Sequence, residues 1–257
     1  MADGLATRTI HGVEVVARPN LVDALATVVE SHGTVYEWAA TQPQPQALKG
    51  RAPVYVATLP GTSDTVAVRH AWHGGLLAPL TGDRFRHPTR APHELAMSAR
   101  LRAAGIPTTD VLGFARYPAW GGFRRVDVIS RFIPEAADLG MVVAGLMPGI
   151  ACEAALEATI VLLRQLAQAG VQHPDLNVKN ILLVREPAGH LAAAVIDVDV
   201  IRWRPATESV IVMRANVDRL TRSMRKWRAR FGCDLPDARI AQFASALLSD
   251  SRPSPLA

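Results

Sequence analysis

Two aspartates and an asparagine are the residues of this sequence best suited to chemistry. Asp175 precedes Asn180 by five residues in a polar loop, and Asp197 ends a later apolar run, where its charge needs a partner. A carboxylate can accept the proton of an attacking hydroxyl, and carboxylate and amide oxygens are ligands that Mg²⁺ prefers. The spacing predicts phosphoryl transfer, with Asp175 as the base and with Asn180 and Asp197 as Mg²⁺ ligands.

Each of these residues also has a simpler interpretation when it is taken singly. Asp175 is typical of a helix or turn cap, and Asp197 of a cap at the end of a strand. The ordered combination favours chemistry: the pattern HxDLxxxN at 173–180 is followed by an apolar run, a hairpin and a second apolar run that ends in Ile-Asp-Val-Asp.

The elements that must position these residues follow from the hydrophobic spacing. The first half predicts an opening helix, two hairpins and a helix between them. The opening helix is expected at 21–30, a loop at 42–46, strands at 53–59 and 65–70, a helix at 93–104, and strands at 111–116 and 125–133. Turn residues at 60–64 and 120–122 close the two hairpins.

The second half is richer in helix. A helix is expected at 151–169 and should end at a left-handed Gly170, two short strands at 181–184 and 192–198, and an amphipathic helix with apolar positions from Met213 to Phe231. The pattern predicts an α+β fold. Its first lobe (1–133) is an antiparallel sheet, and its second lobe (134–257) is mainly helical.

Charge and composition restrict the class of protein. The formal net charge is +5, but residues 214–230 hold seven of the 28 basic residues and one of the 23 acidic ones. A protein that coats nucleic acid is therefore disfavoured, because phosphate tracking needs cations along the whole contact face. We expect no secretory signal and no membrane-spanning segment, and two distant cysteines fit a reducing cytoplasm.

Several motifs in order resemble the lipopolysaccharide kinases, and among them most closely the 3-deoxy-D-manno-octulosonic acid (Kdo) kinases. Residues 69–76 resemble the family's RHYxRGGL strand and loop, 173–183 its HADLNxxNILL loop, 196–200 its IDFDR segment, and 216–226 its NLxRLxRSLRK close. The resemblance covers about residues 48–230. It implies a single protein-kinase-like domain over 1–257 that is bilobal, with the lobes given above.

The resemblance also implies an activity. The γ-phosphoryl group of ATP would be transferred to a hydroxyl of Kdo on a lipid A precursor, with ATP and Mg²⁺ as cofactors. Asp175 would be the catalytic base, Asn180 and Asp197 the metal ligands, and Arg69 a phosphate-binding cation oriented by Glu94. The basic helix 214–230 would contact an anionic membrane, which implies a cytoplasmic protein peripheral on the inner face of the inner membrane; a merely solvated helix face is the alternative.

Departures from the kinase pattern leave two other functions open. Proline at 174 replaces the arginine of the kinase HRD triplet, so we expect no activation by loop phosphorylation. Pro53 removes a backbone donor from the segment that would cover the phosphates. Pro53, Arg69 and Val198 together leave a membrane-associated pseudokinase as one alternative. The other alternative is a kinase for another hydroxyl, such as that of a core heptose or a small-molecule alcohol.

Overall fold

The computed structural model describes residues 4–42, 46–48, 53–72, 82–86, 89–187, 189–233 and 235–249. The chain divides into two compact units. The first unit comprises Met1–Ala99 and Asp110–Phe132, and the second comprises Arg100–Thr109 and Ile133–Ala257. Strands dominate the first unit and helices the second, so the predicted α+β class is confirmed.

The first unit is built on one antiparallel sheet of seven strands. These are β1 (Ala6–Ile10), β2 (Val13–Ala17), β3 (Gln46–Leu48), β4 (Val54–Thr58), β5 (Thr65–His70), β6 (Val111–Pro118) and β7 (Arg124–Arg131). Their order across the sheet is β1-β2-β6-β7-β5-β4-β3. The predicted hairpins are present as the β4–β5 and β6–β7 pairs. A hairpin at the start of the chain, β1–β2, was not predicted.

Helices cover both faces of this sheet. On one face lie α1 (Pro19–His32) and α2 (Val35–Ala40), whose buried residues join the core formed by Val66, Val68 and Ile129. On the other face the start of α4 (Ala91–Ala103) packs through Ala91 and Leu95 onto the sheet. Since successive residues of a strand face opposite sides, Arg69 lies on the α4 face and His70 on the α2 face.

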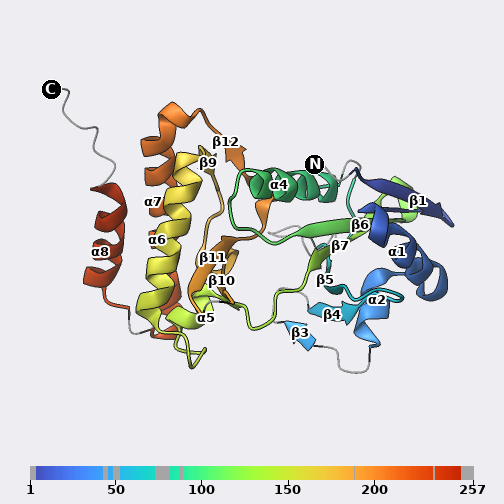
Figure 1. The fold of residues 1–257 in the computed structure, drawn as a ribbon, viewed down its shortest axis with the longest axis horizontal. Helices are drawn as coiled ribbons and strands as arrows, with labels where there is room; N and C mark the ends of the chain where they lie inside the picture. The colour runs from blue at the N-terminus through green and yellow to red at the C-terminus, as the bar shows by residue number, and fades with distance from the viewer. Residues whose placement is uncertain are drawn as a thin grey trace. The chain divides into compact units, whose positions relative to one another are not determined.

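The second unit is a helical layer with short strands. Its main elements are β8 (Ala137–Asp138), α5 (Leu139–Val143), α6 (Cys152–Gln168), β9 (Val171–Gln172), β10 (Ile181–Arg185), β11 (Leu191–Val195), β12 (Arg202–Trp203), α7 (Ser209–Phe231) and α8 (Asp237–Leu248). Figure 1 shows α6, α7 and α8 side by side, and α6 packs against the β10–β11 hairpin. Short 3₁₀ turns are formed by Trp120–Gly122, Val178–Asn180, Val198–Val200 and Ala206–Glu208.

Gly170 ends the α6 segment in the left-handed conformation that the sequence predicted, with φ +71°. Its carbonyl accepts a hydrogen bond from the backbone N–H of Arg204 at 2.7 Å. A Cβ at this position would collide with the carbonyl oxygen of Arg204. Glycine is therefore required here both by the backbone angle and by the close approach of the chain that leads out of β12.

The helix α7 confirms most of the predicted apolar stripe and corrects its end. Met213, Val217, Leu220 and Met224 are buried. Phe231 is 44% exposed, and instead of entering the core it packs on the Trp227 ring at a centroid distance of 4.4 Å. Trp227 in turn lies against Gly140 of α5. The final helix α8 was missed.

Candidate functional site

The loop that carries Asp175 runs from β9 to β10 and is anchored to the core of the second unit by two buried side chains. Leu176 and Val178 are almost completely buried, while the Asp175 side chain between His173 and these anchors is half exposed. Apolar anchors at alternate positions hold the loop rigidly against the second unit. The polar side chains of Asp175 and Asn177 beside these anchors remain partly exposed, where a substrate can reach them.

The Asp175 carboxylate is oriented by a cation that the sequence motifs did not indicate. Arg219 of α7 donates from Nη2 to Asp175 Oδ1 at 2.5 Å. Within the described ranges, the other oxygen, Oδ2, has no hydrogen-bond donor. The ion pair therefore fixes the rotation of the carboxylate and leaves one oxygen free to accept a proton.

Asn180 is held in an orientation that suits a metal ligand. Its Nδ2 donates to the backbone carbonyl of Asp175 at 2.9 Å, and its side chain is mostly buried. Because the amide nitrogen faces the loop, the Oδ1 atom points away from it, and no donor to Oδ1 is present in the part of the chain that the structure describes. The Asn180 carbonyl accepts from the backbone N–H of Ile196 at 3.0 Å, which ties this residue to the segment of Asp197.

Asp197 has a strained backbone. Its φ and ψ are 61° and 50°, in the left-handed region that costs a residue with a side chain about 1–2 kcal/mol. The carboxylate is exposed rather than enclosed by apolar sequence, so the sequence-based expectation of a buried charge is corrected. It forms no hydrogen bond or ion pair with any described residue. Strain that no local contact explains is typical of a functional position.

His173 connects the Asp175 loop to the Asp197 segment. Its Nε2 lies 3.2 Å from the Ile196 carbonyl, and its backbone N–H donates to Asn216 Oδ1 at 3.0 Å. Burial lowers the pKa of His173 below its ordinary value, although the Ile196 carbonyl and two nearby carboxylates oppose the shift. Because a carbonyl oxygen only accepts, Nε2 carries the hydrogen of this bond, and His173 joins the two segments.

The structure brings the three residues predicted from the second-half motif onto adjoining segments. Asn180 donates to the Asp175 carbonyl and accepts from the backbone N–H of Ile196, the residue that precedes Asp197. Asn180 and Asp197 each offer a free oxygen, a donor set that fits Mg²⁺ when nucleotide phosphates complete its coordination. No cluster of three or more His, Cys, Asp or Glu side chains that could hold a metal by itself occurs among the described residues.

Arg69 and Glu94 form an ion pair in the first unit. Arg69 Nη2 lies 2.7 Å from Oε1 and 2.8 Å from Oε2 of Glu94, whose side chain is 12% exposed. The Arg69 side chain itself is 40% exposed. Glu94 thus holds the guanidinium at the sheet surface while part of it stays accessible to an anion.

The neighbouring residue His70 lies between two carboxylates. Nδ1 is 2.6 Å from Asp127 Oδ1, and Nε2 is 3.1 Å from Asp83 Oδ2. Asp127 is fully buried and also accepts from Tyr117 Oη at 2.7 Å and from the Tyr36 backbone N–H at 3.0 Å. Burial lowers the pKa of His70, but the hydrogen bonds and charges of Asp127 and Asp83 outweigh it, so the pKa is raised.

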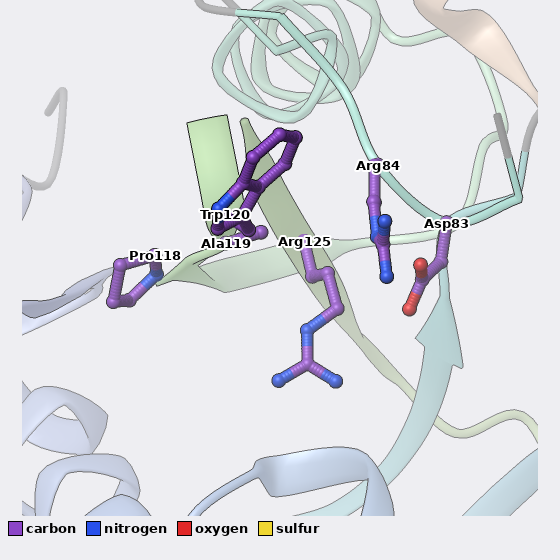
Figure 2. Close-up of a pocket in the computed structure, with 6 residues that line it drawn as sticks. All are labelled: Asp83, Arg84, Pro118, Ala119, Trp120 and Arg125. Atoms are coloured by element: carbon purple, nitrogen blue, oxygen red, sulfur yellow. The ribbon is translucent and has the colours of Figure 1, made fainter. Parts of the chain in front are cut away.

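A pocket lies on the described surface of each unit. The larger, of about 290 Å³, lies in the first unit beside the β6–β7 turn, and Figure 2 shows Arg84, Arg125 and the 85%-exposed Trp120 around it. The smaller, of about 130 Å³, lies in the second unit next to the Asp175 loop. It is lined by Asn177, Arg219, Arg222, Ser223 and Lys226.

The basic residues of α7 have different partners in the structure. Arg219 pairs with Asp175, while Arg225 and Arg228 both pair with Asp237 of α8. The seven cations therefore do not form one free face. The role of Arg219 was missed because the two partners are far apart in sequence; the helical spacing of 219, 222, 223 and 226 was the available signal.

Parts of the motifs lie outside the described residues, namely 49–52 before Pro53 and the His-Gly-Gly-Leu segment at 73–76. Pro53 itself accepts a hydrogen bond through its carbonyl from Tyr36 Oη at 3.0 Å. Trp72 is exposed, and its ring lies edge-on against the His70 ring. No helix among the described residues is long and apolar enough to cross a membrane.

Comparisons with known proteins agree with the motifs. A protein-family model described as "Lipopolysaccharide kinase (Kdo/WaaP) family" matches residues 48–246, which is most of the chain. A search of curated protein sequences found no match. Among solved structures, "WaaP in complex with acyl carrier protein" is similar, with 16% sequence identity, a TM-score of 0.49, and coverage of 88% of this chain and 87% of the other.

Proposed function

We propose that this chain, which belongs to the lipopolysaccharide kinase (Kdo/WaaP) family, is an ATP-dependent kinase for a hydroxyl of Kdo on a lipid A precursor. Family membership establishes a phosphotransferase of lipopolysaccharide synthesis. The observation that carries the proposal further is the set of hydrogen bonds that orients Asp175 and Asn180 and ties Asn180 to Ile196, the residue before Asp197. Among the described residues, no donor reaches Asp175 Oδ2 or Asn180 Oδ1, and the Asp197 carboxylate is exposed.

Asp175 is the proposed catalytic base. The acceptor hydroxyl oxygen attacks the γ-phosphorus of ATP, a new P–O bond forms, and the bond to the β–γ bridging oxygen breaks to release ADP. The hydroxyl proton passes to Asp175 Oδ2, while Arg219 keeps the carboxylate in position through Oδ1. Most of the catalytic effect then comes from positioning, since little covalent chemistry is required of the protein.

Asn180 Oδ1 and the Asp197 carboxylate are the proposed Mg²⁺ ligands. Bound Mg²⁺ supplies charge neutralisation for the phosphate oxygens of ATP. The hydrogen-bonded amide of Asn180 holds its Oδ1 ready before the nucleotide arrives, and no described residue competes for the exposed Asp197 carboxylate.

Arg69 is the proposed nucleotide-phosphate cation, and Glu94 orients it. A guanidinium can grip two phosphate oxygens, whereas lysine offers a single compact charge. The family resemblance favours arginine at this position in Kdo kinases and lysine in heptose kinases. Arg69 is therefore the residue that favours Kdo as the acceptor sugar.

We further propose a cytoplasmic protein that is peripheral at the inner membrane. The cations of α7 without an acidic partner among the described residues include Arg214 and Arg222, and each cation near an anionic leaflet contributes about 1 kcal/mol at physiological salt. Binding to vesicles with and without anionic lipid tests this part separately from the activity.

Mass spectrometry tests the proposed reaction. Wild-type protein, Asp175→Asn and Asp197→Asn are each incubated with ATP, Mg²⁺ and Kdo-lipid A, and a parallel series receives a heptose-containing core. We expect one added phosphate on the Kdo acceptor with wild-type protein only. Phosphate on the heptose acceptor alone would favour the heptose kinase instead. If neither acceptor is modified although ATP binds, both sugar acceptors are excluded, and a kinase for a small-molecule alcohol or a pseudokinase remains.

A further inference from the structure

The smaller pocket beside Asp175 combines three cations with two neutral polar side chains. Arg219, Arg222 and Lys226 lie on one stripe of α7, because residues three, four and seven positions apart share a helix face. Asn177 of the catalytic loop and Ser223 of α7 complete the lining. The pocket thus joins the helix and the loop of the proposed base.

The walls of this pocket are already fixed by hydrogen bonds. Ser223 Oγ accepts from the Val178 backbone N–H at 3.2 Å. Asn177 accepts through Oδ1 from the Lys179 backbone N–H at 2.9 Å and donates through Nδ2 to the Asp175 carbonyl at 3.0 Å. The loop and α7 are therefore held together at the pocket, which gives a preorganised site at low entropic cost.

The charge of the pocket is not balanced from within the described part of the chain. Arg219 has Asp175 as its partner, but neither Arg222 nor Lys226 forms an ion pair with a described acidic residue. By contrast, Arg225 and Arg228 on the neighbouring stripe are both paired with Asp237. Arg222 and Lys226 thus place two cations without a described acidic partner at the pocket.

We propose that this pocket is the subsite for an anionic group of the acceptor, a carboxylate or a phosphate that lies near the hydroxyl to be phosphorylated. The proposal rests on the kinase function proposed above. At about 130 Å³ the pocket is below the range of about 300–1,000 Å³ usual for whole ligands, so it fits one small charged group rather than a complete glycolipid.

In this arrangement Arg222 and Lys226 are specificity-determining residues, and Arg219 is a positioning residue shared between the acceptor anion and Asp175. An anion in the pocket draws the acceptor toward the base, so that binding energy from a remote group orients the reacting hydroxyl. The acceptor class is therefore a hydroxyl compound that carries its own negative charge.

Kinetic variants test the assignment. Arg222→Gln and Lys226→Gln should each raise the KM for the anionic acceptor about tenfold, because a charge-assisted hydrogen bond is lost, while the KM for ATP stays unchanged. Arg202→Gln removes an exposed cation of β12, outside α7 and outside the proposed site, and serves as the control. A rise in the KM for ATP, or an equal effect of Arg202→Gln, would overturn the subsite.

Acceptor analogues identify the group. An acceptor whose sugar carboxylate is converted to an amide, and one whose phosphates are removed, are compared on wild-type protein and on Arg222→Gln. If the variant effect disappears with the first, the pocket binds the carboxylate; if with the second, it binds a phosphate. If it persists with both analogues, no acceptor anion is bound there.

A binding experiment separates this inference from the proposed reaction. Inorganic phosphate and acetate are titrated into the full chain at constant ionic strength, and backbone amide shifts are followed by NMR. We expect saturable shifts at residues 177–179 and 222–226 that weaken in the double variant Arg222→Gln/Lys226→Gln. Absence of such shifts refutes the subsite even if the kinase is active; their presence without any phosphate transfer refutes the reaction alone.

Discussion

Asp197 allows backbone strain and metal binding to be tested at one position. Its φ of 61° places a side-chain-bearing residue where only glycine is unstrained, and asparagine tolerates this region better than alanine. The carboxylate is exposed and forms no hydrogen bond or ion pair with a described residue, so its removal costs no folded-state contact. The backbone conformation alone should decide the stability of variants.

We expect Asp197→Gly and Asp197→Asn to unfold with nearly the wild-type free energy, and Asp197→Ala to be less stable than Asp197→Gly by about 1 kcal/mol. For a chain of this size that corresponds to about 2–4 °C in Tm. All three variants lose the carboxylate, and turnover with Mg²⁺ should fall by about a hundredfold or more.

Urea unfolding in the absence of metal measures the first effect, and initial rates of phosphate transfer measure the second. Asp218→Ala, which removes an exposed acid from α7, is the control and should change stability by less than about 0.5 kcal/mol. Equal stability of the alanine and glycine variants would refute the left-handed backbone. Wild-type turnover in any of the three would refute Asp197 as a metal ligand.

Three further outcomes are expected. Gly170→Ala should lower the free energy of unfolding by about 3 kcal/mol or more, because the new Cβ collides with the Arg204 carbonyl and also adds the strain of a positive φ. Gly105 has a similar φ of +72° but lies in open space, so Gly105→Ala should lower it by only about 1 kcal/mol. Urea titrations of the two variants measure the difference. His70→Asn should destabilise the protein most below pH 6.5 and progressively less as the pH rises through the raised pKa of His70. The reason is that the imidazole between Asp83 and Asp127 stabilises the fold only while it is protonated. A loss of unfolding free energy in the variant that grows with pH would contradict this. Arg219→Gln should lower kcat about tenfold through loss of carboxylate orientation, with partial recovery in Arg219→Lys, and an unchanged kcat would remove Arg219 from the site.

Local sequence signals predicted the elements whose pattern is strong. The helix ending at Gly170 and the hairpin turns at 60–64 and 120–122 follow from glycine and proline chemistry, and the structure has them where expected. The β1–β2 hairpin was missed because most residues of β1 are exposed, which removes the alternation that marks a half-buried strand. Its turn has positive φ at both His11 and Gly12, a signal that a single His-Gly pair conveys weakly.

The site shows the same limit. The spacing of Asp175 and Asn180 within one loop was readable, because both residues belong to a short continuous motif. The Asp175–Arg219 pair was not, since it depends on how α7 packs against the loop. Likewise, Phe231 fits the helical spacing of the apolar stripe, and the spacing alone predicts that it is buried. It is exposed because it lies at the exposed end of the helix, where it packs on the Trp227 ring.

The attachment of the Asp175 loop to α7 separates the proposed acceptor-binding residues from the proposed metal-binding residues. Asn216 holds β9 and His173 from inside the helix, through Nδ2 to the Val171 carbonyl at 3.0 Å and through Oδ1 to the His173 N–H. The oxygens proposed to bind the metal come instead from residues at the two ends of the β10–β11 hairpin. With these proposed roles, substitutions on the outer stripe of one helix would change the choice of acceptor and leave the nucleotide chemistry unchanged.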